Sequence, residues 1–536
     1  MNGVQPYFDN LNNISGPDTQ WSCVNASEAF PGVQTPLSWD FWELTGERAK
    51  RGSYIDMGLL SETEAAEPAD ISDRVWAIFY GRVALSIDFS RNLHSRASRA
   101  QAAAFDRQIY GVTESLPQSD EPDVKTAFAA EAERKSAAHE QVLIAYWRDN
   151  ADAIHQWWKE KISPSALANT EALGKLWIEA QGKFEEASRA HCGTSGIAIR
   201  SYGELRALCE RVGKPDLETR LLAGLGDTHD AQLMNDLWAV AHGETTLEAF
   251  VAEHGYNGAA SSALHSRVWR EDPAALRPLI ERYAGLGEAD SPSAVSRRKG
   301  ADRRAAEAEL FAAVPAAEYE TARALLDRAW TFTRLRELGK VIYMHAVDVG
   351  RAAARALGAD LARRGLLDEP EDIFFLTRPE VMETIRPDIR EIVAFRRARF
   401  SEYRALDIPG YWTGNPIPTV SSDIEIGTSV SGLGVSPGRT EGVVRVVHDP
   451  MESEPLEPGE ILVCHTTDPS WGPFFFVAGG LVIDIGGAMS HGAIIAREIG
   501  VPCVINTRVG TKCFKTGDHV IVDGDNGVVQ LASHTQ

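Results

Sequence analysis

The sequence has few cysteines and no long apolar run, and each shortage excludes a class of protein. Its 536 residues include six cysteines, none of them in a CxxC pair. A disulfide framework is therefore not expected, and no spacing typical of metal ligands appears. No stretch reaches the ~18 apolar residues of a membrane span. The first residues, MNGVQPYFDNLNN, lack the apolar segment of a signal peptide. We therefore expect a cytoplasmic protein.

Positive charge is also scarce. Lys and Arg number 54 against 76 Asp and Glu, which gives a formal net charge of -22 at pH 7. Such an acidic balance argues against a nucleic-acid-binding surface. A phosphate-binding loop of the pattern GxxxxGK[ST] is absent from the sequence. The length itself predicts several domains with sizeable cores.

A helical pattern dominates from about Asp73 to Arg404. Ala, Leu, Glu and Arg are frequent there, and apolar residues recur at spacings of three and four, which is the period of an amphipathic helix. Residues 331–365, TFTRLRELGKVIYMHAVDVGRAAARALGADLARRG, predict one long helix. We expect it to end near Gly365, because glycine commonly follows the last turn of a helix.

The composition changes after residue 410. Residues 411–431 are rich in Pro, Gly, Ser and Thr and are typical of a linker. Short β-type runs follow, namely EGVVRVV, EILVCHT, GGLVIDIG, PCVIN and HVIVDGDNGVVQL, with one helical stretch, SHGAIIAREIG, among them. The sequence thus predicts an α+β multidomain protein. A large, mainly helical acceptor-binding domain (residues 1–410) precedes the linker, and a β/α domain (residues 432–536) follows it.

One histidine occurs at the predicted start of the helix in GGAMSHGAIIAREIG, residues 486–500. Gly486 and Gly487 would let the backbone approach a ligand closely, and Ser490 is a favoured N-cap residue. A helix N-terminus suits a phosphate group and disfavours a charged imidazolium, so His491 is expected to be neutral and nucleophilic. Such a ring can accept a phosphoryl group. The alternative is a capped, hydrogen-bonded structural histidine.

Arg497 and Glu498 follow six and seven residues later. At about 100° per residue, Glu498 returns to the helix face of His491, whereas Arg497 does not. A surface or interdomain ion pair is at least as good an interpretation of Arg497 as a phosphate contact.

Residues 467–507, TDPSWGPFFFVAGGLVIDIGGAMSHGAIIAREIGVPCVINT, closely resemble the phosphohistidine swivelling domain of the PEP-utilising enzymes. That family includes PEP synthase, pyruvate phosphate dikinase and rifampicin phosphotransferase. The matching positions are Thr467, Asp468, Pro469, Gly486, Gly487, Ser490, His491, Ala493, Ala496, Arg497, Glu498, Gly500 and Pro502. The resemblance implies that His491 is the phosphorylated residue and that Ser490, Gly486 and Gly487 support the phosphate.

A weaker resemblance extends to the helical part. WSCVNASEAFPGVQTPLSWDFWE, FYGRVAL, RELGK and GLLDEPEDIFFLT are similar to the drug-binding domain of rifampicin phosphotransferases. That family usually has YGHRG…E before PRWxEDP, but the segment here is HGYNGAASSALHSRVWREDP. Tyr256 and Asn257 replace the expected His and Arg, and Ser261 replaces the expected Glu. We therefore expect a rebuilt acceptor pocket.

The resemblance also implies a nucleotide site, which this sequence does not contain. In the family an ATP-grasp domain of roughly three hundred residues supplies ATP, and no such segment precedes Trp21. We expect a split phosphotransferase in which an ATP-grasp partner subunit binds ATP and Mg²⁺, and we expect this chain to bind no metal. The β-phosphate of ATP would pass to His491, leaving AMP and phosphate. The domain that carries His491 would then swing on the linker to the acceptor.

The expected acceptor is a phenol. The chain looks most like the histidine-bearing subunit of two-subunit alkylphenol (4-cresol) phosphorylating enzymes, the 4-alkylphenyl phosphate synthases. Aromatic residues that could line a phenol pocket are Trp21, Trp39, Trp42, Trp76, Phe79 and Tyr80. Candidates to contact the acceptor or its phosphate are Arg336 and Lys340, which share a helical face, and His345, His191 and His254. An antibiotic phosphotransferase of rifampicin type and a PEP-dependent phosphocarrier are the alternatives.

Overall fold

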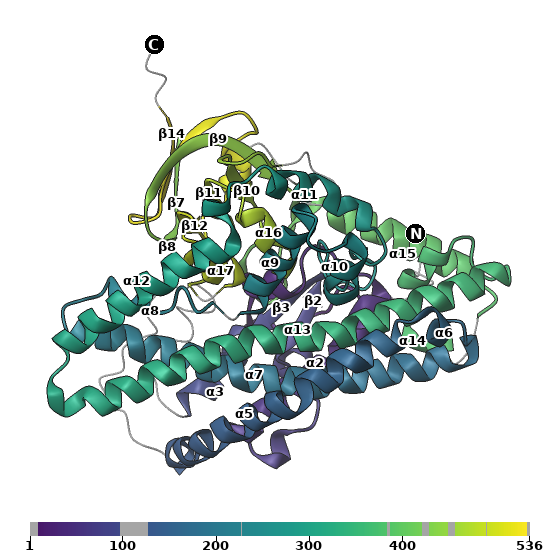
Figure 1. The fold of residues 1–536 in the computed structure, drawn as a ribbon. Helices are drawn as coiled ribbons and strands as arrows, with labels where there is room; N and C mark the ends of the chain where they lie inside the picture. The colour runs from purple at the N-terminus through teal and green to yellow at the C-terminus, as the bar shows by residue number, and fades with distance from the viewer. Residues whose placement is uncertain are drawn as a thin grey trace.

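The computed structural model describes residues 9–96, 127–226, 228–382, 386–420, 428–448, 456–488 and 490–532. Long helices form an elongated body, and a smaller sheet domain from the end of the chain sits against one side of it (Figure 1). Among the helices of the described residues, none is both long and apolar enough to cross a membrane.

Four long helices build the body: α2 (Pro36–Asp56), α5 (Ala127–Lys161), α7 (Leu173–Arg211) and α13 (Tyr319–Arg363). The predicted long helix is confirmed as part of α13, and Gly365 follows its end with a φ of 73°. Two glycines let neighbouring aromatic rings approach the α13 backbone. A Cβ atom on Gly339 would lie 2.8 Å from Trp147, and one on Gly350 would lie 2.6 Å from Phe41. The small residues of α13 therefore set how closely the body packs.

Other helices surround this body. They are α1 (Ala26–Ala29), α3 (Ile87–Ser95), α6 (Pro164–Leu167), α8 (Leu217–Leu221), α9 (His229–Ala241), α10 (Leu247–His254), α11 (Arg277–Ala284), α12 (Pro292–Ala313), α14 (Arg378–Met382) and α15 (Ile389–Arg404). Three more belong to the C-terminal part: α16 (Gly472–Phe475), α17 (His491–Ile499) and α18 (Gly510–Cys513).

A small antiparallel sheet lies within the helical part, and the sequence pattern did not predict it. Its order is β2 (Trp76–Phe79), β3 (Arg82–Ser86), β1 (Gln20–Ser22), β5 (Tyr411–Thr413). A separate pair joins β4 (Leu406–Asp407) to β6 (Thr419–Val420). Strand β5 therefore ties the first residues of the predicted linker to the body. Residues 421–427 of that linker lie outside the described residues.

The C-terminal sheet has eight strands in the order β7, β14, β13, β9, β10, β11, β12, β8. The bounds are β7 (Ser429–Ser431), β8 (Leu433–Ser436), β9 (Arg439–Val447), β10 (Ile461–Cys464), β11 (Gly480–Ile483), β12 (Cys503–Ile505), β13 (His519–Asp523) and β14 (Val528–Leu531). Each β-type run of the sequence forms a strand. Strands β9 to β12 are parallel. The segments that follow β10 and β11 therefore emerge at one edge, and a Cβ atom on Gly492 would lie 3.0 Å from Thr467 Oγ1.

The helical body and the C-terminal sheet share one apolar cluster. Leu237, Trp238 and Tyr283 of the body pack in it with Trp471 and Phe475 of the C-terminal part. The Tyr283 hydroxyl also donates to the carbonyl oxygen of Pro473 at 3.2 Å. The two parts are therefore docked in this structure, with α17 facing the body (Figure 1).

Candidate functional site

His491 is the first residue of α17. The Ser490 hydroxyl accepts a hydrogen bond from the Ala493 N–H at 3.2 Å, so Ser490 caps the helix as its residue type predicts. Gly500 ends the helix in the left-handed conformation, with a φ of 79°. The predicted helix and the position of its histidine are both confirmed.

The His491 ring is enclosed by the helical body. The residue is 1% exposed, and neither ring nitrogen has a hydrogen-bond partner among the described residues. The Nδ1 atom lies 3.7 Å from Glu337 Oε2, which is an ion-pair distance rather than a hydrogen bond. A structural histidine would normally satisfy its buried nitrogens. Two ring nitrogens without hydrogen-bond partners therefore favour a catalytic role for His491 over a structural one.

Three carboxyl groups from three separate elements surround this ring: Glu28 of α1, Asp230 of α9 and Glu337 of α13. Asp230, Glu337 and His491 each offer an atom within 4.8 Å of the others, and all three are buried. Burial raises the pKa of Glu28 to about 7 and that of Asp230 to about 6. Burial opposes ionisation of Glu337 as well, but nearby Arg336, His491 and Lys340 outweigh it and hold its pKa well below the usual range.

Two of the predicted acceptor-site residues lie at this ring. The Arg336 guanidinium donates to Glu337 Oε1 at 2.6 Å. Charges on Lys340 and Arg336 also oppose the rise in the pKa of Glu28, and His491 acts in the same direction. Both cations therefore lie near carboxyl groups that neighbour His491. Cations at this position can bind a phosphoryl group on the ring, and that role stays a prediction.

His191 lies beside these cations, on α7. Its ring packs against Tyr343 at a centroid distance of 5.0 Å, and its Nδ1 atom is buried without a hydrogen-bond partner. Burial, followed by the charges of Arg336 and Lys340, lowers the pKa of His191 to about 3. The ring is therefore neutral at physiological pH.

The other two predicted histidines belong to a second buried cluster. His345 stacks on Trp158 at 4.8 Å and meets the Tyr256 ring edge-on at 4.5 Å. His254 Nε2 pairs with Asp236 Oδ2 at 2.7 Å. His229, the residue before Asp230, bonds through Nε2 to the Tyr256 hydroxyl at 2.6 Å. Tyr256, which replaces the histidine expected from the resemblance, thus connects this cluster to α9.

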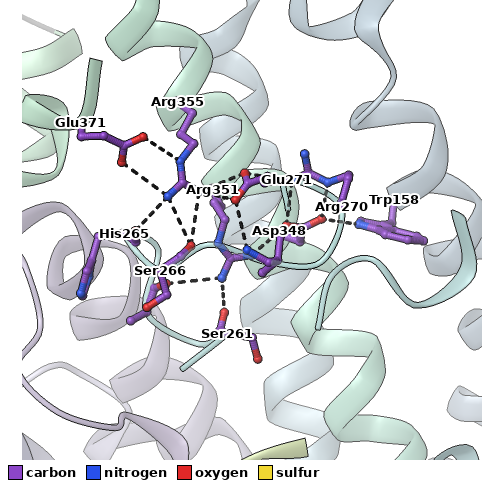
Figure 2. Close-up of polar contacts among 12 residues, drawn as sticks. Trp158, Ser261, His265, Ser266, Arg270, Glu271, Asp348, Arg351, Arg355 and Glu371 are labelled. Carbon is purple, nitrogen blue, oxygen red and sulfur yellow. Dashed lines mark hydrogen bonds and ion pairs between the residues drawn. The ribbon is translucent and has the colours of Figure 1, made fainter. Parts of the chain in front are cut away.

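The segment HGYNGAASSALHSRVWREDP, which differs from the family pattern at Tyr256, is bonded to α13 through buried charged side chains. Arg351 is fully buried and donates to Asp348 Oδ1 at 2.7 Å and to the carbonyl oxygen of Ser261. Arg270 and the Trp158 indole N–H also donate to Asp348, at 3.0 and 2.9 Å. Figure 2 shows these groups converging on one carboxylate. The segment is therefore bonded to α13 at both Ser261 and Arg270.

Asp468 and Glu498, which belong to the family pattern, also bond to the backbone of the helical body. The Glu498 carboxylate accepts from the backbone N–H groups of Leu225 and Gly226 at 3.3 and 3.2 Å. The Asp468 carboxylate accepts from the Ala260 N–H at 2.9 Å. Arg497 instead donates to the carbonyl oxygen of Val435 within its own domain, and its guanidinium lies 6.0 Å from the centre of the Tyr202 ring. Within the described residues, Arg497 therefore makes neither the surface nor the interdomain ion pair considered above.

The loop before α17 is adjacent to the body as well. A Cβ atom on Gly486 would lie 3.4 Å from Glu28 Oε1 and 3.2 Å from Ser490 Oγ, so the glycine gives the carboxyl group room. The Gly487 carbonyl oxygen accepts from the Ser490 N–H at 2.9 Å. Both glycines thus shape the approach to His491.

The six aromatic residues suggested for a phenol pocket lie mainly in packed cores. Trp21 and Phe79 are 0% exposed and pack together at a ring distance of 5.4 Å. Trp42 packs against Phe30 and Phe184, each at 4.5 Å. Their contacts favour a role in packing the hydrophobic core rather than in lining a pocket.

Sequence reasoning missed Glu28, Asp230 and Glu337. Glu337 lies between Arg336 and Lys340 in the RELGK stretch, so its position was open to inference. Glu28 lies in the stretch WSCVNASEAFPGVQTPLSWDFWE that carries the resemblance to the drug-binding domain, but no role was assigned to it. Asp230 carried no signal, because a single acidic residue in a helix is ordinary in a protein with 76 Asp and Glu. Only the fold brings these carboxyl groups to the ring.

Comparisons with known proteins match two stretches of this chain, and His491 lies within one of them. Residues 456–527 match the family described as PEP-utilising enzyme, mobile domain, and residues 204–337 match the fourth domain of rifampicin phosphotransferase. Each match lies within one of the two domains predicted from the sequence, whose boundaries stay predictions. A solved structure of a UPF0107 protein is 20% identical over 20% of this chain and 99% of its own, at a TM-score of 0.17, which is too low to support any statement about the fold.

Relatives of known name are phosphotransferases. The rifampicin phosphotransferase of Streptomyces sviceus is 32% identical over 327 residues, which are 58% of this chain and 37% of the relative. That of Bacillus subtilis is 31% identical over 56% of this chain and 36% of the relative. An uncharacterized protein of Mycobacterium tuberculosis is 30% identical over 67% of this chain and 41% of the relative.

The chain spans less than half the length of these relatives. It therefore contains a segment of the mobile-domain type found in PEP-utilising enzymes, with His491 in it, and its homologues include proteins named rifampicin phosphotransferase.

Proposed function

We propose that this chain is the phosphohistidine-bearing and acceptor-binding part of an ATP-dependent phosphotransferase. An ATP-grasp partner subunit binds ATP and Mg²⁺, and the β-phosphate is transferred to His491 with release of AMP and phosphate. The phosphoryl group then passes to a hydroxyl group bound on the helical domain. The observation that carries this proposal is the buried His491 ring, with both nitrogens open, at a capped helix N-terminus beside Arg336 and Lys340.

The surroundings of the ring support a role for its Nε2 atom. Glu337 faces Nδ1 and can hold a proton there, which leaves the lone pair of Nε2 for the phosphorus atom. The cations of Arg336 and Lys340 offset the phosphoryl charge, and enclosure by the body excludes water that would hydrolyse the phosphoramidate. When the P–N bond breaks, its electron pair returns to the ring nitrogen.

We propose a phenol, such as 4-cresol, as the acceptor. In the second cluster, next to α9, the buried rings of Trp158, Tyr256 and His345 pack on one another, so a phenol bound there would replace some of these ring contacts with its own. A rifampicin-like macrocyclic alcohol is the second candidate, and the names of the relatives favour it. The replacement of the expected His, Arg and Glu by Tyr256, Asn257 and Ser261 favours a changed acceptor.

The first prediction concerns the phosphorylated residue. Treating the chain with phosphoramidate, a small phosphoryl donor, should place an acid-labile phosphate on His491, and His491→Asn should accept none. The substitution should leave the melting temperature nearly unchanged, because the ring nitrogens make no hydrogen bond that would be lost. Peptide mass spectrometry at alkaline pH locates the phosphate.

His345→Asn serves as the matched control, because that ring is equally buried but lies in the second cluster. It should be labelled like the wild type. A phosphate found on another histidine, with His491 unmodified, would disprove the relay.

A further inference from the structure

We propose that Asp230 is the catalytic base that removes the proton from the acceptor hydroxyl during transfer from His491. This inference rests on the proposed function and adds a residue to it. Three carboxyl groups surround His491, and the question is which of them is available to take a proton.

Two of the three are less suited to this step. Glu337 receives a hydrogen bond from Arg336 at 2.6 Å and faces His491 Nδ1 at 3.7 Å. A carboxylate held by a guanidinium is a weak base, because the bound donor stabilises its ionised form. Burial raises the pKa of Glu28 to about 7, so its position and not its basicity sets it apart. Glu28 lies outside the group of side chains, Asp230, Glu337 and His491, whose atoms are within 4.8 Å of one another.

Asp230 differs from both. Its residue is 4% exposed, and no hydrogen bond or ion pair of its carboxyl group is found within the described part of the chain. One of its oxygens nevertheless lies within 4.8 Å of a His491 nitrogen and of a Glu337 oxygen. A buried, unengaged carboxyl group at the reacting ring is well placed to receive a proton.

The environment of Asp230 raises the pKa of its carboxyl group. Burial is the main reason that its pKa is raised, and Glu337 and Glu498 act in the same direction. His491 and Lys340 oppose them. His229, next to it in α9, is bonded to Tyr256 and has a lowered pKa. A base with a pKa near the operating pH is the most effective general base.

The proposed step conserves atoms and charge. The acceptor O–H bond breaks and its proton moves to Asp230, while the oxygen forms a bond to phosphorus. The P–N bond to His491 breaks, and its electron pair stays on the ring nitrogen. Because His491 belongs to the C-terminal domain, undocking removes a group that faces Asp230 and lets solvent take the proton.

The test isolates the second half-reaction. Wild-type protein and the variants Asp230→Asn, Asp230→Glu, Glu337→Gln and Glu28→Gln are loaded with phosphoramidate to the same phosphate content on His491. Loss of that phosphate is then followed after addition of 4-cresol, phenol or rifampicin, in EDTA and in Mg²⁺. Asp230→Asn should transfer about 100-fold more slowly, within the range for loss of a general base, and Asp230→Glu should recover part of the rate.

The pH profile separates a base from a structural group. Wild-type transfer should slow as the pH falls through about 6, where Asp230 becomes protonated, and Asp230→Asn should lack this dependence. Glu28→Gln and Glu337→Gln should keep it. Equal pH profiles for the wild type and Asp230→Asn, or transfer by the wild type only in Mg²⁺, would overturn the assignment, the latter because Asp230 would then be a metal ligand. If phosphorylated wild-type protein transfers to no hydroxyl compound, the proposed function itself fails, and this inference fails with it.

Discussion

At the scale of single residues, the main feature is a buried network of charged side chains around Asp348. Asp348 is 0% exposed and receives donors from Arg351, Arg270 and Trp158. Burial opposes its ionisation, but Arg270 and Arg351 outweigh that effect and lower the pKa of Asp348 to about 2. An ion pair in this setting is costly to break, because the partner that remains is a buried and uncompensated charge. This pair fixes the segment that carries Tyr256 (Figure 2).

Replacing Arg351 with Met should therefore lower the free energy of unfolding by about 3–5 kcal/mol. Urea denaturation followed by circular dichroism measures the change. The matched control is Arg390→Met, because Arg390 pairs with Asp368 where both side chains are more than half exposed. That change should cost no more than about 1 kcal/mol. Similar losses in the two variants would show that the buried network has no special weight.

The depressed pKa of Asp348 also gives a pH dependence. An acid whose folded pKa is lower than its unfolded value of about 3.9 stabilises the fold above that value. This contribution is lost as the pH falls from about 4 toward 2. The difference in stability between the wild type and Asp348→Asn should therefore depend on pH in this window. A constant difference between pH 2 and pH 6 would contradict the assignment.

At the scale of elements, α17 has a different task at each end. Its first residue is His491, and near its last turn Glu498 binds the backbone of residues 225–226. Burial raises the pKa of Glu498, and the N–H groups of Gly226 and Leu225 oppose that rise. The helix is thus anchored to the body at the end opposite to the reacting ring.

Glu498→Ala should loosen this anchor, because it removes the acceptor of two backbone N–H groups, those of buried Leu225 and of exposed Gly226. A loss of about 1.4 kcal/mol would speed local opening about tenfold. Hydrogen exchange and mass spectrometry of peptides that contain Leu225 and Gly226 measure it. Glu457→Ala is the matched control, since Glu457 also pairs across the two parts, with Arg282, but is 53% exposed. Unchanged exchange in Glu498→Ala would rule out an anchoring role.

At the scale of the whole molecule, one conformation cannot serve both half-reactions that we propose. The structure shows the C-terminal domain docked, with an apolar cluster shared between it and the body. His491 is closed off in this state, so loading by a partner requires undocking. Strand β5 shortens the region that can act as a hinge, because it fixes residues 411–413 to the body.

A crosslink should therefore permit one transfer only. Cysteines in place of Arg282 and Glu457, which form an exposed ion pair 2.6 Å apart, can be joined by a short thiol crosslinker after His491 has been loaded. The crosslinked protein should transfer its phosphoryl group once and then resist reloading, whereas reduction of a cleavable crosslinker should restore loading. Repeated turnover in verified crosslinked protein would show that no domain motion is needed.

Much of the fold followed from local patterns. Period and composition predicted α13, strands β9 to β14 of the C-terminal sheet and the capped start of α17. Strand β8 was not predicted, and β7 lies within the predicted linker. The sheet around β1 was missed, because its strands are short and three of them lie far apart in the sequence. The face shared by Arg336 and Lys340 followed from helix geometry, whereas Asp230 offered no pattern to interpret and Glu28 only its place in a stretch similar to the drug-binding domain.

The sequence by itself determined the local setting of His491. Gly486, Ser490 and His491 lie within one short stretch, where backbone approach, helix capping and the helix dipole act locally, so their arrangement depends little on the rest of the chain. The tertiary structure alone decided which groups meet the His491 ring. Glu28, Asp230 and Glu337 come from helices hundreds of residues away, and their carboxyl groups acquire unusual pKa values only when packing removes them from water and places them beside one another.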